Sequence, residues 1–320
     1  MVSTVIVLCC LLGLTIAERQ WSHHDEGAWP GKCGVGEEQS PINIVPHETY
    51  ADPHETHIRG PLVYRGYSDV QVTAKNTGYK VRWAIVPGTP TPVLSGGPLR
   101  SNYTFAEVHF HWLSEHSMNG VKYPLEIHMV HLKTGLNLQQ ALDQRDGVAV
   151  VGVLAQVGPI GRSGVLNELL PAMDYVVDEN NDESPPFNID LTRLFSPNPQ
   201  AFYTYHGSLT TPLCPEVVTW IVMDQPTTVT HEHYKNLTRA DLDGINNDRK
   251  VQPLGTRMVY RSKEVASCSH IASPSFFGLA AALMTCFRSK MSSTLLGALC
   301  SLINAKRRLL GNVFNKAKCN

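Results

Sequence analysis

Three histidines with strand-like spacing are the residues of this chain best suited to chemistry. Only Phe110 separates His109 from His111, and His128 follows 17 residues later. Side chains alternate between the two faces of a β-strand, so His109 and His111 are expected to point the same way. The interval before His128 allows a turn and a neighbouring strand that brings a third imidazole alongside. Three imidazoles leave one position of a tetrahedral zinc ion open for water, as in a catalytic zinc site.

A carboxylate accompanies the third histidine. Glu126 lies two residues before His128 and therefore shares its face of the strand, where it could orient a ligand imidazole through a hydrogen bond. The alternative is that a His-x-His pair in a strand is only a surface or internally hydrogen-bonded pair. A third histidine with a nearby carboxylate favours the metal site.

The segments that must position these residues are mostly β-strands. Alternating apolar and β-branched residues predict strands at 70–74, 79–83, 104–112, 125–131, 148–154 and 217–222. Helical patterns are few, at 164–177 and at 230–236, where Thr230 can cap the first turn. The pattern predicts a β-dominated domain over residues 19–264, with minor helices and the histidines on central strands.

The N-terminal residues predict export from the cell. Residues 1–17 carry no charge and contain an apolar run at 5–12, and small residues stand at Thr15 and Ala17. The run is too short to span a bilayer, and polar residues follow at once, so the segment is interpreted as a signal peptide. A secreted or extracellular protein is expected.

The cysteines fit that compartment. Of eight, two belong to the signal peptide, and only Cys33 and Cys214 fall within residues 19–264. Two cysteines in an oxidising compartment suggest one disulfide that closes a very long loop. Asn102 and Asn236 begin Asn-x-Thr triplets and are candidate glycosylation sites. The remaining cysteines, for which no pairing is predicted, are Cys268, Cys286, Cys300 and Cys319.

The C-terminal residues 265–320 differ in charge from the rest. They hold seven of the 27 basic residues and none of the 28 acidic ones, which leaves 20 basic and 28 acidic residues in 1–264, a formal charge of −8. This negative charge disfavours nucleic acid as a partner of residues 1–264, and none is expected. The tail has three interpretations: a basic amphipathic segment on an anionic membrane, a poorly ordered extension, or a lipid-anchor signal. Its basic end disfavours the last.

Several segments resemble the motifs of the α-class carbonic anhydrases, in the order of that family, from about Trp21 to Ser262. They are residues 39–44 (QSPINI), 109–112 (HFHW), 114–130 (SEHSMNGVKYPLEIHMV), 208–212 (SLTTP) and 219–222 (TWIV). The resemblance implies one mainly β domain, built on a large, twisted, mostly antiparallel sheet with a conical cavity that reaches Zn²⁺ at its floor. It also implies reversible hydration of carbon dioxide to bicarbonate and a proton, and inhibition by sulfonamide-type anions.

The resemblance assigns roles to five residues. His109, His111 and His128 would be the zinc ligands. Thr210 would accept a hydrogen bond from zinc-bound hydroxide, and Glu115 would accept the Thr210 hydroxyl proton. A hydroxyl has one proton, so a hydrogen bond from Thr210 to Glu115 uses it and leaves Thr210 only as an acceptor towards the hydroxide. Without the resemblance, Thr210 would be interpreted as a turn residue and Glu115 as a surface carboxylate.

The resemblance also implies a pocket and a disulfide. An apolar wall would hold carbon dioxide beside the nucleophile, although these side chains are also typical of an ordinary core. A disulfide between Cys33 and Cys214 would link the N-terminal segment to the loop that carries Thr210. The expected pocket residues are Val130, Val150, Leu209, Thr211 and Trp220.

Two positions depart from the family pattern. Tyr79 stands where the proton-shuttle histidine is expected, and a tyrosine that titrates near 10 is a poor relay at neutral pH. His23 or His206 could take that role instead. Glu107 stands where many members have glutamine, and a carboxylate there would raise the basicity of a ligand imidazole.

A catalytically weak or inactive extracellular binding or matrix protein of the same family is the alternative function. Inactive members typically lose one or more zinc histidines. This chain keeps all three, together with Thr210 and Glu115. The sequence therefore favours the enzyme.

Overall fold

The computed structural model describes residues 21–52, 54–159, 166–178, 183–242 and 246–265. The expected signal peptide, residues 1–17, lies outside the described residues, as does the tail after its first residue. No helix among the described residues is long and apolar enough to cross a bilayer.

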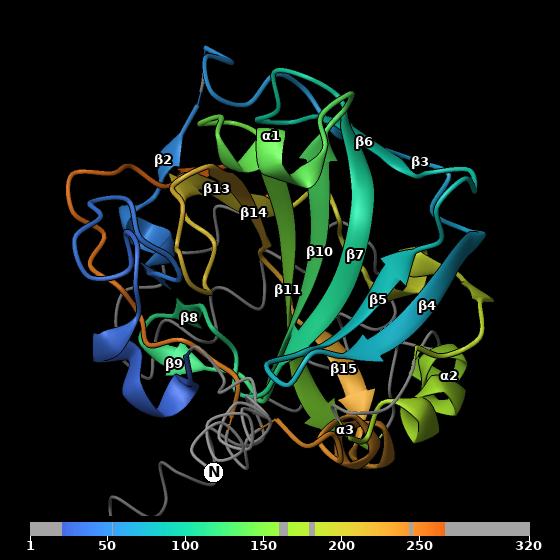
Figure 1. Ribbon diagram of the computed structural model, residues 1–320. Coiled ribbons are helices and arrows are strands. Elements are labelled where there is room, and N and C mark those ends of the chain that lie inside the picture. The colour runs from blue at the N-terminus through green and yellow to red at the C-terminus, as the bar shows by residue number, and fades with distance from the viewer. Residues whose placement is uncertain (1–20, 53, 160–165, 179–182, 243–245, 266–320) are drawn as a thin grey trace, which may run out of the picture. The chain divides into compact units, whose positions relative to one another are not determined.

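Thirteen strands among the described residues form one large sheet (Figure 1). They are β2 (Tyr50–Ala51), β3 (Leu62–Arg65), β4 (Val70–Asn76), β5 (Val81–Ile85), β6 (Val93–Gly96), β7 (Tyr103–His111), β10 (Leu125–Lys133), β11 (Val148–Gly158), β12 (Phe187–Ile189), β13 (Phe202–Gly207), β14 (Val218–Met223), β15 (Thr227–Thr230) and β16 (Tyr260–Arg261). A second, small sheet contains β1 (Asn43–Ile44), β8 (Ser117–Met118) and β9 (Val121–Lys122).

The large sheet has the order β12-β4-β5-β7-β10-β11-β14-β13-β16-β2. Neighbouring strands are antiparallel from β12 to β11, and again from β14 through β13 to β16. Three pairs are parallel: β11 with β14, β11 with β15, and β16 with β2. The long strands β7, β10 and β11 lie side by side at its centre (Figure 1). The predicted mainly β fold with a mostly antiparallel sheet is confirmed.

All six predicted strands are present, as β4, β5, β7, β10, β11 and β14. The predicted start of β5 is two residues too early, because residues 77–80 form a turn in which Thr77 N donates to Lys80 O at 3.0 Å. Gly78 adopts a φ of +79° in this turn, a conformation that glycine reaches without strain.

The helices are short. The α-helices are α1 (Leu138–Leu142), α2 (Leu166–Leu169) and α3 (His231–Leu237), and the 3-10 helices are η1 (His23–Ala28), η2 (Pro46–Glu48), η3 (Leu170–Tyr175) and η4 (Leu191–Leu194). Thr230 caps α3 as predicted, because its hydroxyl accepts from His233 N at 3.1 Å. The helix predicted at 164–177 changes from α to 3-10 at Leu170, next to Pro171, which cannot donate to the α-helical ladder. Sequence reasoning missed α1, where Asn137 and Gln140 form a capping box.

Alternate residues of the central strands enter two different cores. On β10, Ile127 and Met129 pack into the larger core, whereas Val130 joins a second core that contains Val150 and Trp220. Because side chains alternate, even-numbered residues of β10 share the face of this second core. His128 therefore projects from the same side of the sheet as Val130.

Candidate metal centre

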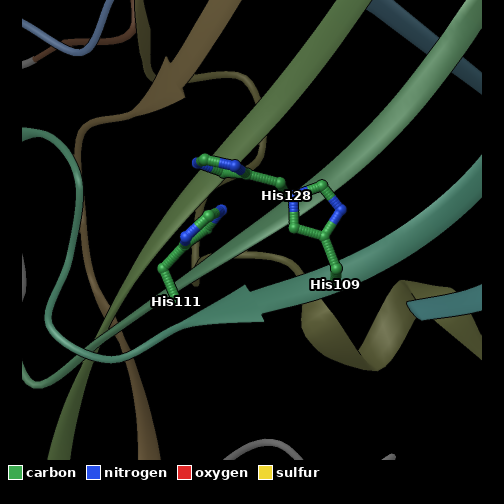
Figure 2. A group of neighbouring side chains, drawn as sticks. All are labelled: His109, His111 and His128. Atoms are coloured by element: carbon green, nitrogen blue, oxygen red, sulfur yellow. The ribbon is translucent and has the colours of Figure 1, made fainter. Parts of the chain in front are cut away.

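Two adjacent strands bring the three histidines together. His109 and His111 lie on β7 and His128 on β10, where His128 is the direct cross-strand partner of His109. One ring nitrogen from each histidine lies within 4.8 Å of the others, and the ring centroids are 4.6 to 5.3 Å apart. Figure 2 shows the three rings grouped on one side of the strands. All three are buried.

The remaining nitrogen of each ring faces an acceptor. His111 Nδ1 donates to Asn247 O at 2.7 Å, and His128 Nε2 donates to Glu126 Oε1 at 2.8 Å. His109 Nδ1 lies 3.0 Å from Glu107 Oε1. The two hydrogen bonds assign the protons of His111 and His128 to the outer nitrogens, and the carboxylate that faces His109 Nδ1 favours the same assignment there. They leave His109 Nε2, His111 Nε2 and His128 Nδ1 with lone pairs.

The electrostatics keep two of these rings neutral. Burial lowers the pKa of His109 to about 3, and burial together with the neighbouring His128 and His109 holds the pKa of His111 well below its usual value. His111 Nε2 is buried without a hydrogen-bond partner. Neutral imidazoles with an unused buried lone pair are the donor set that zinc takes, so the residues fit the ion that the sequence implies.

Glu126 joins His128 to a second histidine. The same Oε1 that binds His128 accepts from His116 Nδ1 at 2.7 Å, and Oε2 accepts from His116 N at 2.8 Å. Tyr205 hydroxyl lies 2.6 Å from His116 Nε2. His116, Glu126 and His128 form another cluster of metal-binding residue types, but these hydrogen bonds account for their closeness. Burial raises the pKa of Glu126, but the two imidazoles outweigh it and hold the pKa well below its usual value.

Glycine at position 152 makes room for this network. Gly152 is the cross-strand partner of His128, and a Cβ there would lie 3.1 Å from Glu126 Oε1. Such a contact is tighter than ordinary van der Waals packing, so a larger residue would push the carboxylate away from His128.

Glu107 lies in an ionic cluster on the other side of the centre. Lys80 Nζ donates to Glu107 Oε1, Arg82 NH1 lies 3.7 Å from Oε2, and Arg82 NH2 lies 3.8 Å from Glu183 Oε1. Burial raises the pKa of Glu107, but Lys80 and His109 outweigh this effect, and the pKa lies below its usual value. Glu107 is therefore a carboxylate beside His109, as its sequence position suggested.

Glu115 lies next to two of the histidines and interacts with Thr210. Glu115 is fully buried, so it is not a surface carboxylate. Its Oε1 accepts from Arg249 N at 3.0 Å, and its Oε2 lies 3.5 Å from His111 Nε2. Burial raises the pKa of Glu115 to about 7, against the opposing effects of His128 and a hydrogen bond with Thr210. Thr210 is also buried. The roles that the resemblance gives the two residues stay predictions.

Three of the expected pocket residues form a row across the sheet. Val130 is the cross-strand partner of Val150, and Val150 is that of Trp220. Leu209 packs against the same core. Thr211 lies half-buried in the following turn, where its carbonyl accepts from Cys214 N at 2.9 Å.

Two links fix the loop that carries Thr210. Cys33 and Cys214 form a disulfide, as the sequence predicted. Trp220 Nε1 donates to Ser208 O at 3.1 Å. The loop is thereby joined to the N-terminal segment on one side and to β14 on the other.

The candidate proton shuttles lie in two places. Tyr79 stacks on Trp21 with ring centroids 3.8 Å apart, and His23 contacts the edges of Trp21 and Trp29. His206 lies elsewhere: its Nε2 bonds to Arg145 O at 2.6 Å. Strand alternation turns His206 away from the face of Tyr205.

Sequence reasoning missed His116, Tyr205, Asn247 and Arg249. His116 lies inside the 114–130 motif and could have been found there, as a second imidazole close to Glu126. Each of the others contacts a residue that lies 89 to 136 positions earlier in the sequence, and a single sequence carries no signal for contacts at such separations.

The glycosylation candidates differ in accessibility. Asn102 is exposed in the turn before β7. Asn236 lies in α3 and is half-buried, with Nδ2 donating to Glu232 O at 3.0 Å. Modification of either residue stays a prediction.

Comparison with known proteins gives a consistent result. The family model described as eukaryotic-type carbonic anhydrase matches residues 17–263. The chain is 32% identical to "Putative carbonic anhydrase 5" of Caenorhabditis elegans over 306 residues, which cover 86% of this chain and 92% of the relative. It is 32% identical to "Carbonic anhydrase 3" of Homo sapiens over 243 residues (71% and 90%), and 32% identical to "Carbonic anhydrase 4" of Mus musculus over 252 residues (73% and 78%).

Proposed function

The chain belongs to the eukaryotic-type carbonic anhydrases, and from this membership and the metal centre we propose that it catalyses zinc-dependent, reversible hydration of carbon dioxide. The family supports carbon dioxide and bicarbonate as the substrate pair. The observation that carries the zinc-dependent mechanism is the convergence of one lone-pair nitrogen from each of His109, His111 and His128.

The three imidazoles would hold the ion, and zinc in such a site supplies Lewis-acid activation of water. Asn247 O and Glu126 orient two of the rings from behind, so that their lone pairs need no rearrangement when the ion binds. A centre assembled before binding limits the conformational entropy that binding removes.

Thr210 and Glu115 would orient the attacking water. The Thr210 hydroxyl would donate a hydrogen bond to the buried Glu115, which would leave the Thr210 oxygen free to accept. Arg249 N holds Glu115 Oε1 in place. The attacking oxygen then keeps a lone pair for the carbon atom of the substrate.

The apolar row would hold carbon dioxide. Val130, Val150 and Trp220 present no charged group, and carbon dioxide is small and nonpolar. Bicarbonate is charged, so the same wall favours its departure once the carbon–oxygen bond has formed.

Metal analysis paired with a carbon dioxide hydration assay tests the proposal. The wild type should bind one zinc ion and hydrate carbon dioxide, and an aromatic sulfonamide should inhibit it. His128→Ala should lower hydration more than about 100-fold, because even outer-shell substitutions cost metal centres 10- to 100-fold. The exposed His47 provides the control, and His47→Ala should change neither property.

The alternative, a catalytically weak or inactive binding or matrix protein, makes the opposite prediction. Zinc-loaded wild type would then lack hydration activity. Persistence of full activity in His128→Ala would instead show that the chemistry lies elsewhere in the chain.

Proton export would limit turnover. Tyr79 occupies the expected shuttle position and stacks on Trp21, and His23, the remaining candidate, contacts the same indole. A tyrosine is a poor relay at neutral pH. Imidazole buffer should therefore raise the maximal hydration rate several-fold at pH 7, measured at constant ionic strength. A rate independent of buffer concentration would contradict this limitation.

We also propose an extracellular location. The disulfide between Cys33 and Cys214 is compatible with an oxidising compartment. The uncharged segment 1–17 supports secretion. We expect glycosylation at Asn102. The basic tail after residue 265 is a candidate for contact with the outer surface of a membrane. Mass spectrometry of the secreted protein, reading both termini and the glycan, tests all of these points.

A further inference from the structure

A cavity of about 360 Å³ lies beside the open edge of β13, away from the three histidines of the metal centre. Among the residues that the structure describes, β13 pairs with β16 at Tyr203 and Thr204, and the edge of the next residues has no strand partner there. Tyr205 and His206 line the cavity at this point. Its volume is sufficient for a small organic ligand.

Three arginines line this cavity: Arg59, Arg100 and Arg257. Among the described residues, none of the three forms an ion pair with a carboxylate. The Arg257 guanidinium donates to three backbone carbonyls, those of Leu254, His206 and Pro253, at 2.8 to 3.2 Å. The guanidinium is thus fixed in the cavity wall, and Glu38 and Glu216 act on its charge from a distance, without forming an ion pair.

The nearby carboxylates are already engaged. Glu38, which lines the cavity, pairs with Arg145 at 2.6 Å and lies 3.3 Å from His206 Nδ1. Asp52 accepts from three successive backbone N–H groups, those of residues 56–58. Glu38 is the one carboxylate among the lining residues, against three arginines, so the cavity wall carries an excess of positive charge in an otherwise acidic part of the chain.

The cavity also has an aromatic wall. His57 stacks on Tyr260 with ring centroids 3.9 Å apart and an interplanar angle of 18°, and both residues line the cavity. Such a stack presents apolar surface beside the positive charges. A ligand that carries both an anionic group and a ring or sugar would match both features.

The geometry points to a binding site for a small organic anion that carries a tetrahedral phosphate or sulfate group. Guanidinium groups match such oxyanions through paired N–H donors, and Arg59 and Arg100, neither of which pairs with a carboxylate among the described residues, keep N–H groups for a ligand. Arg257, whose donors are engaged by backbone carbonyls, adds positive charge. The site would be separate from the metal centre, and its existence does not depend on the proposed hydration activity.

Isothermal titration calorimetry of the metal-loaded protein tests the proposal, with inorganic phosphate, inorganic sulfate and phenyl phosphate as probes. Saturable binding of an inorganic anion is expected, and phenyl phosphate should bind more tightly because of the aromatic wall. A difference between phosphate and sulfate identifies the preferred oxyanion. The variant Arg59→Met/Arg100→Met should bind about tenfold more weakly, because it loses two charge-assisted contacts at exposed positions.

Two control variants test whether anion binding is specific to this cavity. Arg65 on β3 is exposed and does not line the cavity, so Arg65→Met should bind phosphate as the wild type does. His128→Ala removes a proposed metal ligand and should also leave binding unchanged, whether or not the chain is an enzyme. Absence of saturable binding, equal binding by the double arginine variant, or loss of binding in His128→Ala would overturn the proposal.

Discussion

Glu126 and Glu107 each contact one imidazole of the metal centre, but their surroundings are opposite. Glu126 is fully buried, and its partners are His116, His128 and a backbone N–H. The Glu107 side chain is 14% exposed, and its partners besides His109 are the long, partly exposed Lys80 and Arg82.

The difference lies in how each charge is compensated. No solvent reaches Glu126, so its partners cannot be replaced by water if one is lost. The cations around Glu107 reach the surface, where water and salt can take over part of their role. Two residues with similar positions beside the histidines should therefore differ in how strongly the fold depends on them.

Replacement of Glu126 should have the larger effect. Glu126→Ala leaves His116 Nδ1, His128 Nε2 and a backbone N–H buried without acceptors, which should lower the free energy of unfolding by about 3–5 kcal/mol. Zinc affinity should fall about 10–100-fold, because His128 loses the group that orients it. Urea denaturation and competition with a chromophoric chelator measure the two quantities.

Glu126→Gln is the matched control for shape. The amide keeps one oxygen acceptor and nearly the same volume but removes the charge, so its cost should be smaller than that of alanine. Equal stability of the wild type and Glu126→Ala would show that the buried network does not hold the fold at this point.

Glu107→Gln should change metal binding more than stability. The amide oxygen can still accept from His109 Nδ1, but the negative charge that makes this imidazole more basic is lost. Zinc affinity should fall about tenfold, while the free energy of unfolding changes by less than about 1 kcal/mol, since Lys80 can turn to water. A stability loss as large as that of Glu126→Ala would remove the contrast between the two carboxylates.

The same contrast marks the limit of prediction from the sequence. His109, His111, Glu126 and His128 were found because strand alternation determines which residues share a face. The partners of Glu126 were not, since Tyr205 reaches His116 across 89 residues of chain. Lys80 was not found either, because its contact with Glu107 requires knowing that β5 lies next to β7.

The fold shows a similar limit. The six predicted strands carry enough alternation to be recognised, whereas β2 and β16 have two residues each and no period to detect. Their formation depends on neighbouring strands and not on local pattern. The disulfide was predictable because only Cys33 and Cys214 remained in the domain, so no choice of partner was needed.

Lys80→Met should have the smallest effect, and in the opposite direction to Glu107→Gln for metal binding. The substitution removes a cation next to the carboxylate that contacts His109, while Arg82 remains 3.7 Å from that carboxylate. Zinc affinity should rise about two- to threefold, and the free energy of unfolding should fall by less than about 1 kcal/mol, because the Lys80 side chain is 25% exposed. Lys75→Met, on β4 opposite Arg82, is the control and should leave zinc affinity unchanged. At about 1 M salt the difference in zinc affinity between Lys80→Met and the wild type should shrink, since screening then acts over about 3 Å.

A fall in the zinc affinity of Lys80→Met would mean that Lys80 serves to hold Glu107 against His109. The ionic cluster would then be as essential to His109 as the buried network is to His128.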